Sequence, residues 1–312
     1  MILLFAVLAF AIFIGIARGS VDIPVARLIL KENRPILYMR ILRVFLGIMV
    51  GSGLASSGVA LQAILRNPLA EPYLLGTSSG AGLGAVIAIM TGLGGVYLPF
   101  FAFIGAVLSI IIVYAIAKSG NSIPVQSLIL AGVIISVALS AIIVFLVSMS
   151  RSNAIHGLMW WFWGSLEVYD IKLLFVAACI VLPGILAIFF FSQDLNAISL
   201  GEEEAMHLGI GVEGVKRMIF CLTSLITASL VCVTGVIGFV GLIIPHITRF
   251  VVGPNHKMLV PASCVTGAVF LVFCDLLSRT LISPSEIPIG VITTAIGAPV
   301  FIFLLKIKQR IR

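Results

Sequence analysis

Residues 194–217 carry the densest charge of the chain, and their carboxylates are suited to binding a partner surface. The segment reads DLNAISLGEEEAMHLGIGVEGVKR, whereas 61% of the whole chain is hydrophobic and only 10% is charged. A charged helix between apolar segments has to lie in water, where another protein can reach it. We therefore expect this segment to face a protein partner. A solvated loop helix without a partner is the alternative.

The same segment contains signals for the start and end of a helix. Ser199 and Glu202 have the S-x-x-E spacing of a capping box, in which both side chains bond free backbone N–H groups. Glu202–Glu204 then fall in the first turn, where the helix dipole favours negative charge. Gly209 and Gly211 are typical of a left-handed helix end. The pattern predicts a helix over residues 199–209.

No other segment indicates a catalytic or cofactor site. The glycine-rich run at 77–84, TSSGAGLG, lacks the Lys-Ser ending and the preceding strand of a nucleotide loop. Its small residues, like Gly47 and Gly51, are expected to let helices approach closely. The sequence has no GxxxxGKS segment, so any ATP hydrolysis has to belong to a partner. We expect no catalytic residue and no bound cofactor.

Histidines and cysteines do not form a metal-binding pattern. The histidines are dispersed, and the cysteines all fall in apolar segments, which favours packing over disulfides or metal binding. The residues are His156, His207, His246, His256, Cys179, Cys221, Cys232, Cys264 and Cys274. A separate aromatic run, with Trp160, Trp161 and Trp163, suits a membrane-interface belt, and ligand stacking is the less favoured alternative.

The composition defines the class of protein. A mean hydropathy of +1.26 over 312 residues leaves too little polar surface for a soluble domain. About 20 apolar residues cross a bilayer core of roughly 30 Å. We therefore predict an all-α polytopic membrane protein in one domain, 1–312, although nine or eleven spans are also compatible with the pattern. The ten predicted spans are 2–17, 44–65, 75–93, 97–117, 125–148, 171–191, 216–235, 238–252, 259–276 and 288–306.

The basic residues hardly decide the orientation. With ten spans and an internal N-terminus, ten Lys and Arg residues fall inside and nine outside. We read residues 1–17 as a span rather than a signal peptide, because the stretch lacks a positively charged start. Arg40 and Arg43, three residues apart, and Arg279 could form an outer basic dock for acidic groups. Interfacial snorkelling is the alternative. Asp275 is one helical turn from Arg279 and is a possible partner for it.

The placement of carboxylates disfavours ion coupling. Carriers driven by protons or sodium usually bury a carboxylate or histidine near the middle of the bilayer. No predicted span has a carboxylate at its centre, although backbone carbonyls could still bind sodium. Any energised transport should then draw on a partner, through the acidic segment. A secondary carrier, a channel and an intramembrane enzyme are the alternatives, but the sequence shows neither a polar filter nor a catalytic constellation.

Five strings, in order along the chain, resemble the permease subunits of binding-protein-dependent ABC importers for iron-siderophores, haem and cobalamin. The likeness extends from about Arg40 to Leu305. The strings are RNPLAEPYLLGTSSGAGLGAV (66–86), SLILAGV (127–133), LGEEEAMHLGI (200–210), GVIGFVGLIIPHITR (235–249) and EIPIGVITTAIGAPVFIFLL (286–305).

The resemblance implies an architecture and partners. It implies ten spans, with the second to fifth related to the seventh to tenth by an inverted repeat. It also implies a homodimer in a prokaryotic inner membrane, with cytoplasmic termini. Two ABC ATPase subunits and a periplasmic or lipid-anchored binding protein would complete the complex, with no nucleic acid. The segment 199–209 would be the cytoplasmic coupling helix. Its ATPase contacts would be Leu200, Gly201, Glu202, Glu203, Glu204, Ala205, Leu208 and Gly209.

The resemblance also implies two further sets of residues. Arg40, Arg43 and Arg279 match outer arginines that pair with glutamates of the binding protein, although the family's proline between the first two is missing here. Asn67 and Leu69 match the cytoplasmic constriction of the pathway. Val125 and Gln126 stand where a small hydroxyl pair occurs in the cobalamin permease, which weakens a cobalamin assignment. An iron chelate is thus the expected cargo, with a corrinoid or an oxyanion as alternatives.

Overall fold

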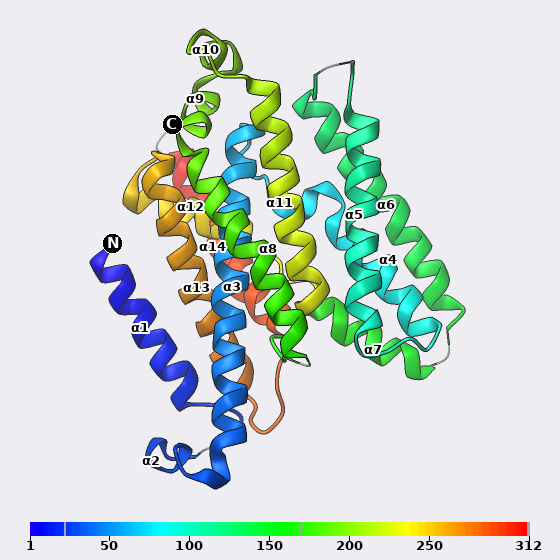
Figure 1. Cartoon of the computed structure of the whole chain (residues 1–312), viewed down its shortest axis with the longest axis vertical. Helices are drawn as coiled ribbons and strands as arrows, with labels where there is room; N and C mark the ends of the chain where they lie inside the picture. The colour runs from blue at the N-terminus through cyan, green and yellow to red at the C-terminus, as the bar shows by residue number, and fades with distance from the viewer. Residues whose placement is uncertain (22, 121, 151, 169, 311–312) are drawn as a thin grey trace.

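The computed structural model describes residues 1–21, 23–120, 122–150, 152–168 and 170–310, and these residues form helices joined by short connections (Figure 1). The side chains of His156, Lys308 and Arg310, and all of Arg312, lie outside the described part. The only strand-like pairing in the described part is one isolated bridge between Ser119 and Ser122. The predicted all-α class is confirmed.

Ten apolar helices in the described residues match the ten predicted spans. Six of them are long enough to cross a membrane, and four are shorter. The long ones are α3 (Arg34–Ile64), α5 (Tyr97–Ala117), α6 (Val125–Ser148), α8 (Ile171–Phe190), α11 (Val212–Thr234) and α13 (His256–Thr280). The short ones are α1 (Ile2–Ala17), α4 (Thr77–Met90), α12 (Val240–Val252) and α14 (Ile289–Arg310), whose described apolar part ends at Leu304.

Short helices at the two ends of the bundle were not predicted from the apolar pattern. One end carries α9 (Ser192–Leu200) and α10 (Glu202–His207), and we call it the α10 end (Figure 1). The opposite end, the α7 end, carries α7 (Ser152–Trp163) and α2 (Val25–Leu28). Two 3-10 turns, η1 (Lys31–Asn33) and η2 (Pro72–Leu75), complete the described elements. These elements are shorter than the roughly 20 apolar residues that indicate a membrane span in a sequence.

Helix α3 is the centre of the bundle and begins ten residues before the predicted span, at Arg34. In the most apolar 18-residue stretch of this helix, 83% of the residues are buried, whereas in the corresponding stretch of α6 only 22% are buried. The buried face of α3 meets α13 where Gly51 lies against the backbone of Gly267. Helix α6 instead exposes Leu130, Val137 and Val144. The small residues thus serve close packing, as predicted.

The two shortest spans, α4 and α12, each follow an irregular connection within the bundle. The connection before α4 contains η2 and ends at Gly76, whose φ of 78° is left-handed. The connection before α12 ends at Phe239, with a φ of 70°. The two connections meet: the Tyr73 hydroxyl donates to the Ile237 carbonyl at 3.1 Å and accepts from the Ile237 N–H at 3.3 Å. One side chain therefore satisfies backbone groups that have no helical partner.

The contact of Gly51 with Gly267 generates a stability prediction. An added Cβ at Gly51 would overlap the Gly267 carbonyl, so Gly51→Ala must push α3 and α13 apart. We expect a loss of about 1–3 kcal/mol in unfolding free energy, the usual effect of overpacking. Thermal unfolding in detergent measures it. The control is Gly214→Ala in α11, where a Cβ meets nothing within 4 Å. Equal behaviour of the two variants would contradict the packing role.

Candidate functional site

The acidic segment forms two helices rather than the predicted single helix over 199–209. Helix α9 ends at Leu200 and α10 begins at Glu202, because Gly201 between them has extended backbone angles. The predicted capping box is also wrong. Ser199 lies inside α9, where its Oγ donates to the Leu195 carbonyl at 2.7 Å, and Gly201 is the N-cap of α10.

The predicted charge placement and one of the two predicted stops are confirmed. Glu202, Glu203 and Glu204 occupy the first turn of α10. Gly209 has a φ of 82° and closes the helix in the left-handed conformation. Gly211 has a φ of −75° and instead stands at the N-cap of α11. The second glycine therefore starts a span rather than ending α10.

The surface of this segment is both acidic and apolar, and we call its exposed residues the α10 knob. Glu203, Glu204 and Gly209 are exposed, and Leu200, Met206 and Leu208 expose 72%, 56% and 68% of their surface. Ala205 and Gly201 are buried beneath it, and Glu202 is half-buried. Exposed apolar side chains clustered beside carboxylates indicate a protein contact. The knob thus has the chemistry of a docking surface.

The segment is attached to the bundle by an asparagine and a histidine. The Asn196 Oδ1 of α9 accepts from the backbone N–H of His256 at 2.8 Å and lies 2.7 Å from His256 Nδ1. The Asn196 amide also donates to the side chain of Asn255, which caps α13. An amide oxygen can only accept a hydrogen bond, so this contact requires the proton of the ring on Nδ1. Helix α9 is thereby tied to the first residue of α13.

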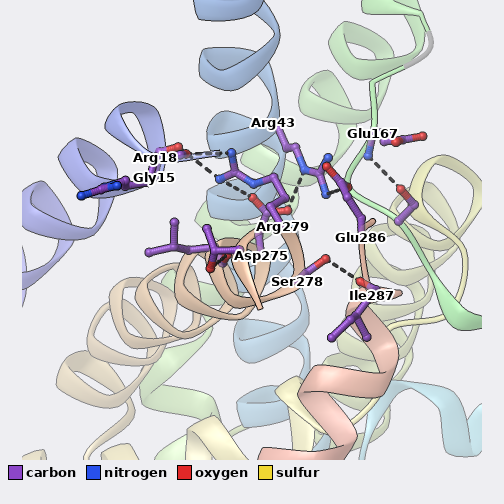
Figure 2. A network of polar contacts seen from close by, with 12 residues as sticks. Gly15, Arg18, Arg43, Glu167, Asp275, Ser278, Arg279, Glu286 and Ile287 are labelled. Atoms are coloured by element: carbon purple, nitrogen blue, oxygen red, sulfur yellow. Dashed lines mark hydrogen bonds and ion pairs between the residues drawn. The ribbon is translucent and has the colours of Figure 1, made fainter. Parts of the chain in front are cut away.

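At the α7 end, two arginines hold the end of α1. Arg40 donates to the carbonyls of Ile16 (3.1 Å), Ala17 (3.0 Å) and Val21 (2.7 Å). Arg279 donates to the carbonyls of Gly15 and Arg18, both at 3.1 Å (Figure 2). Cations are favoured at the negative end of a helix dipole, where carbonyls lack helical partners. The two side chains therefore fix α1 on the bundle.

Arg279 also belongs, together with Arg43, to a network of charges that centres on Asp275 (Figure 2). Asp275 Oδ1 lies 2.7 Å from Arg43 Nε, and its Oδ2 lies 2.9 Å from Arg279 Nη2, which confirms the predicted partner of Arg279. Arg43 Nη2 also pairs with Glu286 at 2.8 Å. A buried carboxylate between two guanidinium groups offsets charges that would be costly alone.

The charge network and the carbonyls of α1 determine which of the three predicted dock arginines is accessible at the surface. Two of the three arginines predicted for the dock are buried, because Arg40 is 5% exposed and Arg279 is 2% exposed, both turned toward α1. Only Arg43, whose side chain is 12% exposed, reaches the surface, beside the 25% exposed side chain of Glu286. The carbonyls of α1, distant in the sequence, are the reason for the inward orientation.

A cavity of about 700 Å³ adjoins this pair at the α7 end. Arg43 and Glu286 line it together with Trp160, Trp161 and Leu173. Trp160 and Trp163 expose 50% and 46% of their surface, as an interface belt requires, whereas Trp161 is half-buried. The tryptophans thus serve both the surface and the wall of the cavity.

The predicted gate residues lie in two places at the α10 end. Asn67 follows α3, and its Oδ1 accepts from the Leu69 N–H at 2.9 Å, which closes an Asx turn that leaves Leu69 exposed. Val125 is the first residue of α6 and lines a very small cavity of about 10 Å³ with Leu65, while Gln126 is exposed. No hydrogen bond joins the two pairs within the described residues. Burial raises the pKa of the nearby Glu71 carboxyl above its usual range.

Several residues that organise these sites were not singled out from the sequence. Glu213, Asn196 and Tyr73 contact groups 60 to 164 residues away along the chain, and Lys216 bonds Glu202, 14 residues before it. Glu213 and Ile123, for example, are 90 residues apart. No local spacing indicates such pairs. For Lys216, two signals were available: its i,i+3 spacing from Glu213, and its place near the start of an apolar span, where a buried cation needs a partner.

Comparisons with known proteins agree with this architecture, which is that of a multi-pass α-helical transporter subunit. The model of the FecCD transport family matches residues 7–307, and the chain belongs to this family. It is 39% identical to the cobalamin import permease BtuC of Halobacterium salinarum, over 87% of this chain and 73% of that protein. It is 35% identical to the hemin permease HmuU of Yersinia pestis, over 88% and 83%.

A solved structure gives the same result for the fold. An ABC transporter described as of the metal-chelate type, in an inward-facing conformation, is 31% identical with a TM-score of 0.89, and 97% of each chain is covered. The protein is therefore a permease of the ABC importers in this family, a component of a transporter.

The charge network generates the second prediction. Asp275→Asn leaves the buried Arg279 and the partly buried Arg43 without their shared carboxylate, so we expect a loss of about 3–5 kcal/mol in unfolding free energy. Glu286→Gln removes a partly exposed partner of Arg43 alone, and it should cost about 1 kcal/mol or less. Thermal unfolding of the two purified variants compares them. A larger loss with Glu286→Gln would contradict the central place of Asp275.

Proposed function

We propose that the chain is the membrane subunit of an importer that moves an iron chelate, either a siderophore complex or haem. A soluble binding protein would deliver the chelate, and a separate ATPase would supply the energy. The observation that carries the proposal is the α10 knob, an exposed acidic and apolar surface on a chain of this family. A corrinoid or an oxyanion is the alternative cargo. The cobalamin relative favours the first of these.

The α10 end is proposed to face the cytoplasm, because the knob needs an ATPase partner there. With ten spans, both termini would lie on that side of a prokaryotic inner membrane. ATP-driven closure of two ATPase subunits would push the knob, and rigid spans would carry the shift to the constriction near Asn67 and Leu69. Coupling residues would be the exposed Leu200, Glu203, Glu204 and Leu208.

A second copy of the chain is proposed to complete the pathway. Helix α6 leaves most of its apolar surface uncovered in the single chain, including Leu130, Val137 and Phe145. Lipid covers part of that surface, and a second copy would cover the rest. A pathway shared by two subunits suits a bulky chelate better than the inside of one bundle.

Ion-coupled transport is the other class, and the charges argue against it. Asp275 is a buried carboxylate within a span, but both of its oxygens are paired with arginines. A carboxylate that carries protons or sodium has to exchange partners during transport. Asp275 instead holds the bundle together at the α7 end.

The third prediction concerns the α10 knob. Glu203→Lys should weaken the association of the purified ATPase subunits by about tenfold or more, because a docking groove for this acidic surface has to be complementary in charge. Pull-down titration in detergent measures the affinity. The matched control is Glu32→Lys, the same change at an exposed residue of the opposite end. Undiminished association with Glu203→Lys would remove the knob from the ATPase interface.

The fourth prediction concerns binding-protein docking at the α7 end. An acidic group of the binding protein has to compete with Glu286 for Arg43. Glu286→Gln should therefore strengthen the complex at low salt, whereas Arg43→Gln should weaken it. Binding to the immobilised permease gives both affinities. Changes of the same sign in the two variants would argue against Arg43 as the docking residue.

The cargo requires a separate measurement. Mass spectrometry of the ligand that the cognate binding protein retains on purification should find an iron chelate. A corrinoid or an oxyanion in its place would replace that part of the proposal and leave the rest intact.

A further inference from the structure

We propose that Lys216 and Glu213 form a relay that transmits movement of α10 to the start of α6. The inference rests on the proposed function, because it names the residues through which an ATPase that pushes the knob would move the start of α6. The relay consists of Glu202, Lys216, Glu213 and the backbone N–H of Ile123. Its members come from α10, α11 and the connection between α5 and α6.

The first link joins α10 to α11. Lys216 Nζ lies 2.6 Å from Glu202 Oε2 and 3.2 Å from Glu213 Oε1. The lysine side chain is only 7% exposed, whereas the two carboxylates are 32% and 36% exposed. A buried ammonium group is costly to leave unpaired. Lys216 therefore has to move together with the carboxylates when either helix moves.

The second link joins α11 to the connection before α6. Glu213 uses one oxygen for Lys216, and its other oxygen, Oε2, accepts from the Ile123 N–H at 2.9 Å. Hydrogen bonds to a charged acceptor are among the stronger ones in proteins. Ile123 is 4% exposed, so its backbone is also held by packing. A shift of Glu213 thus displaces the buried Ile123.

The geometry beyond Ile123 passes the displacement into a span. Pro124 follows directly and is the N-cap of α6, which begins at Val125. A proline ring fixes φ, so the two residues before α6 have little freedom to absorb a movement. Val125 and Gln126 are the residues that the family resemblance places at the pathway gate. The relay therefore ends at the predicted gate.

The knob has few other ties of this kind. Within the described residues, the contact of Glu202 with Lys216 is the only side-chain hydrogen bond or ion pair between α10 and a span. Asn196 ties α9, and not α10, to α13. Glu203 and Glu204 are exposed, so a partner could reach them. Docking and transmission thus use different glutamates of the same turn.

The test uses the complete transporter in vesicles, with ATP hydrolysis and cargo uptake measured together. Lys216→Met removes the charge and keeps the length of the side chain. We expect uptake per ATP hydrolysed to fall about two- to thirtyfold, the range of mutational effects on coupling between sites. ATPase association should stay as in the unaltered chain. Lys216→Arg should restore coupling, and Lys257→Met, at an exposed lysine of the same end, should leave it unchanged.

A second measurement separates transmission from stability. In a cysteine-free background, spin labels at Met206→Cys in α10 and Gln126→Cys in α6 report the two ends of the relay. With Lys216→Met, ATP should still shift the α10 label, but the α6 label should no longer respond. Glu213→Gln should give the same pattern, and it replaces Lys216→Met if that variant fails to fold.

The outcomes distinguish the relay from the proposed function. Uptake per ATP and an α6 response that both match the unaltered chain would overturn the relay, provided that the unaltered chain shows ATP-driven uptake. If the unaltered transporter shows no ATP-driven uptake, the proposed function itself fails.

Discussion

The central constraint on this protein is that polar groups inside a lipid-embedded bundle must find partners within the protein. Two spans begin inside the bundle, and one tyrosine, Tyr73, hydrogen-bonds the connection that leads into α12. Helix α3 also approaches its neighbours closely, because glycines without side chains stand at the contacts. Irregular backbone, tight packing and a small number of polar side chains therefore depend on one another.

The same constraint explains the arginines at the α7 end. Arg40 and Arg279 bind carbonyls at the end of α1, and Asp275 balances the charges of Arg43 and Arg279. These contacts fix α1 and α13 against α3. They also leave Arg43 as the residue of the three that a binding protein could reach. Arg40 and Arg279 are thus structural, and the proposed docking role falls to Arg43 alone of three arginines that look equivalent in the sequence.

The sequence predicts the spans well because crossing a membrane demands a length of apolar residues, and this demand is local. The first turn of α10 and the stop at Gly209 were predictable for the same reason. The break at Gly201 was not, because S-x-x-E spacing also occurs where a serine bonds back within the preceding helix. The orientation of Arg40 could not be predicted from the sequence either, since its carbonyl partners lie 19–24 residues away along the chain. Glu213 shows the same limit at the opposite end, because its partner Ile123 lies 90 residues away.

We propose that energy enters at the α10 knob and that cargo crosses through spans that have no energy source of their own. The most direct measurement is cargo accumulation in vesicles that contain the permease, with its binding protein supplied on the outer side, in the presence and absence of the ATPase subunits. Accumulation should require both the ATPase and ATP, and an ion gradient alone should produce none. Accumulation without any nucleotidase would contradict the account.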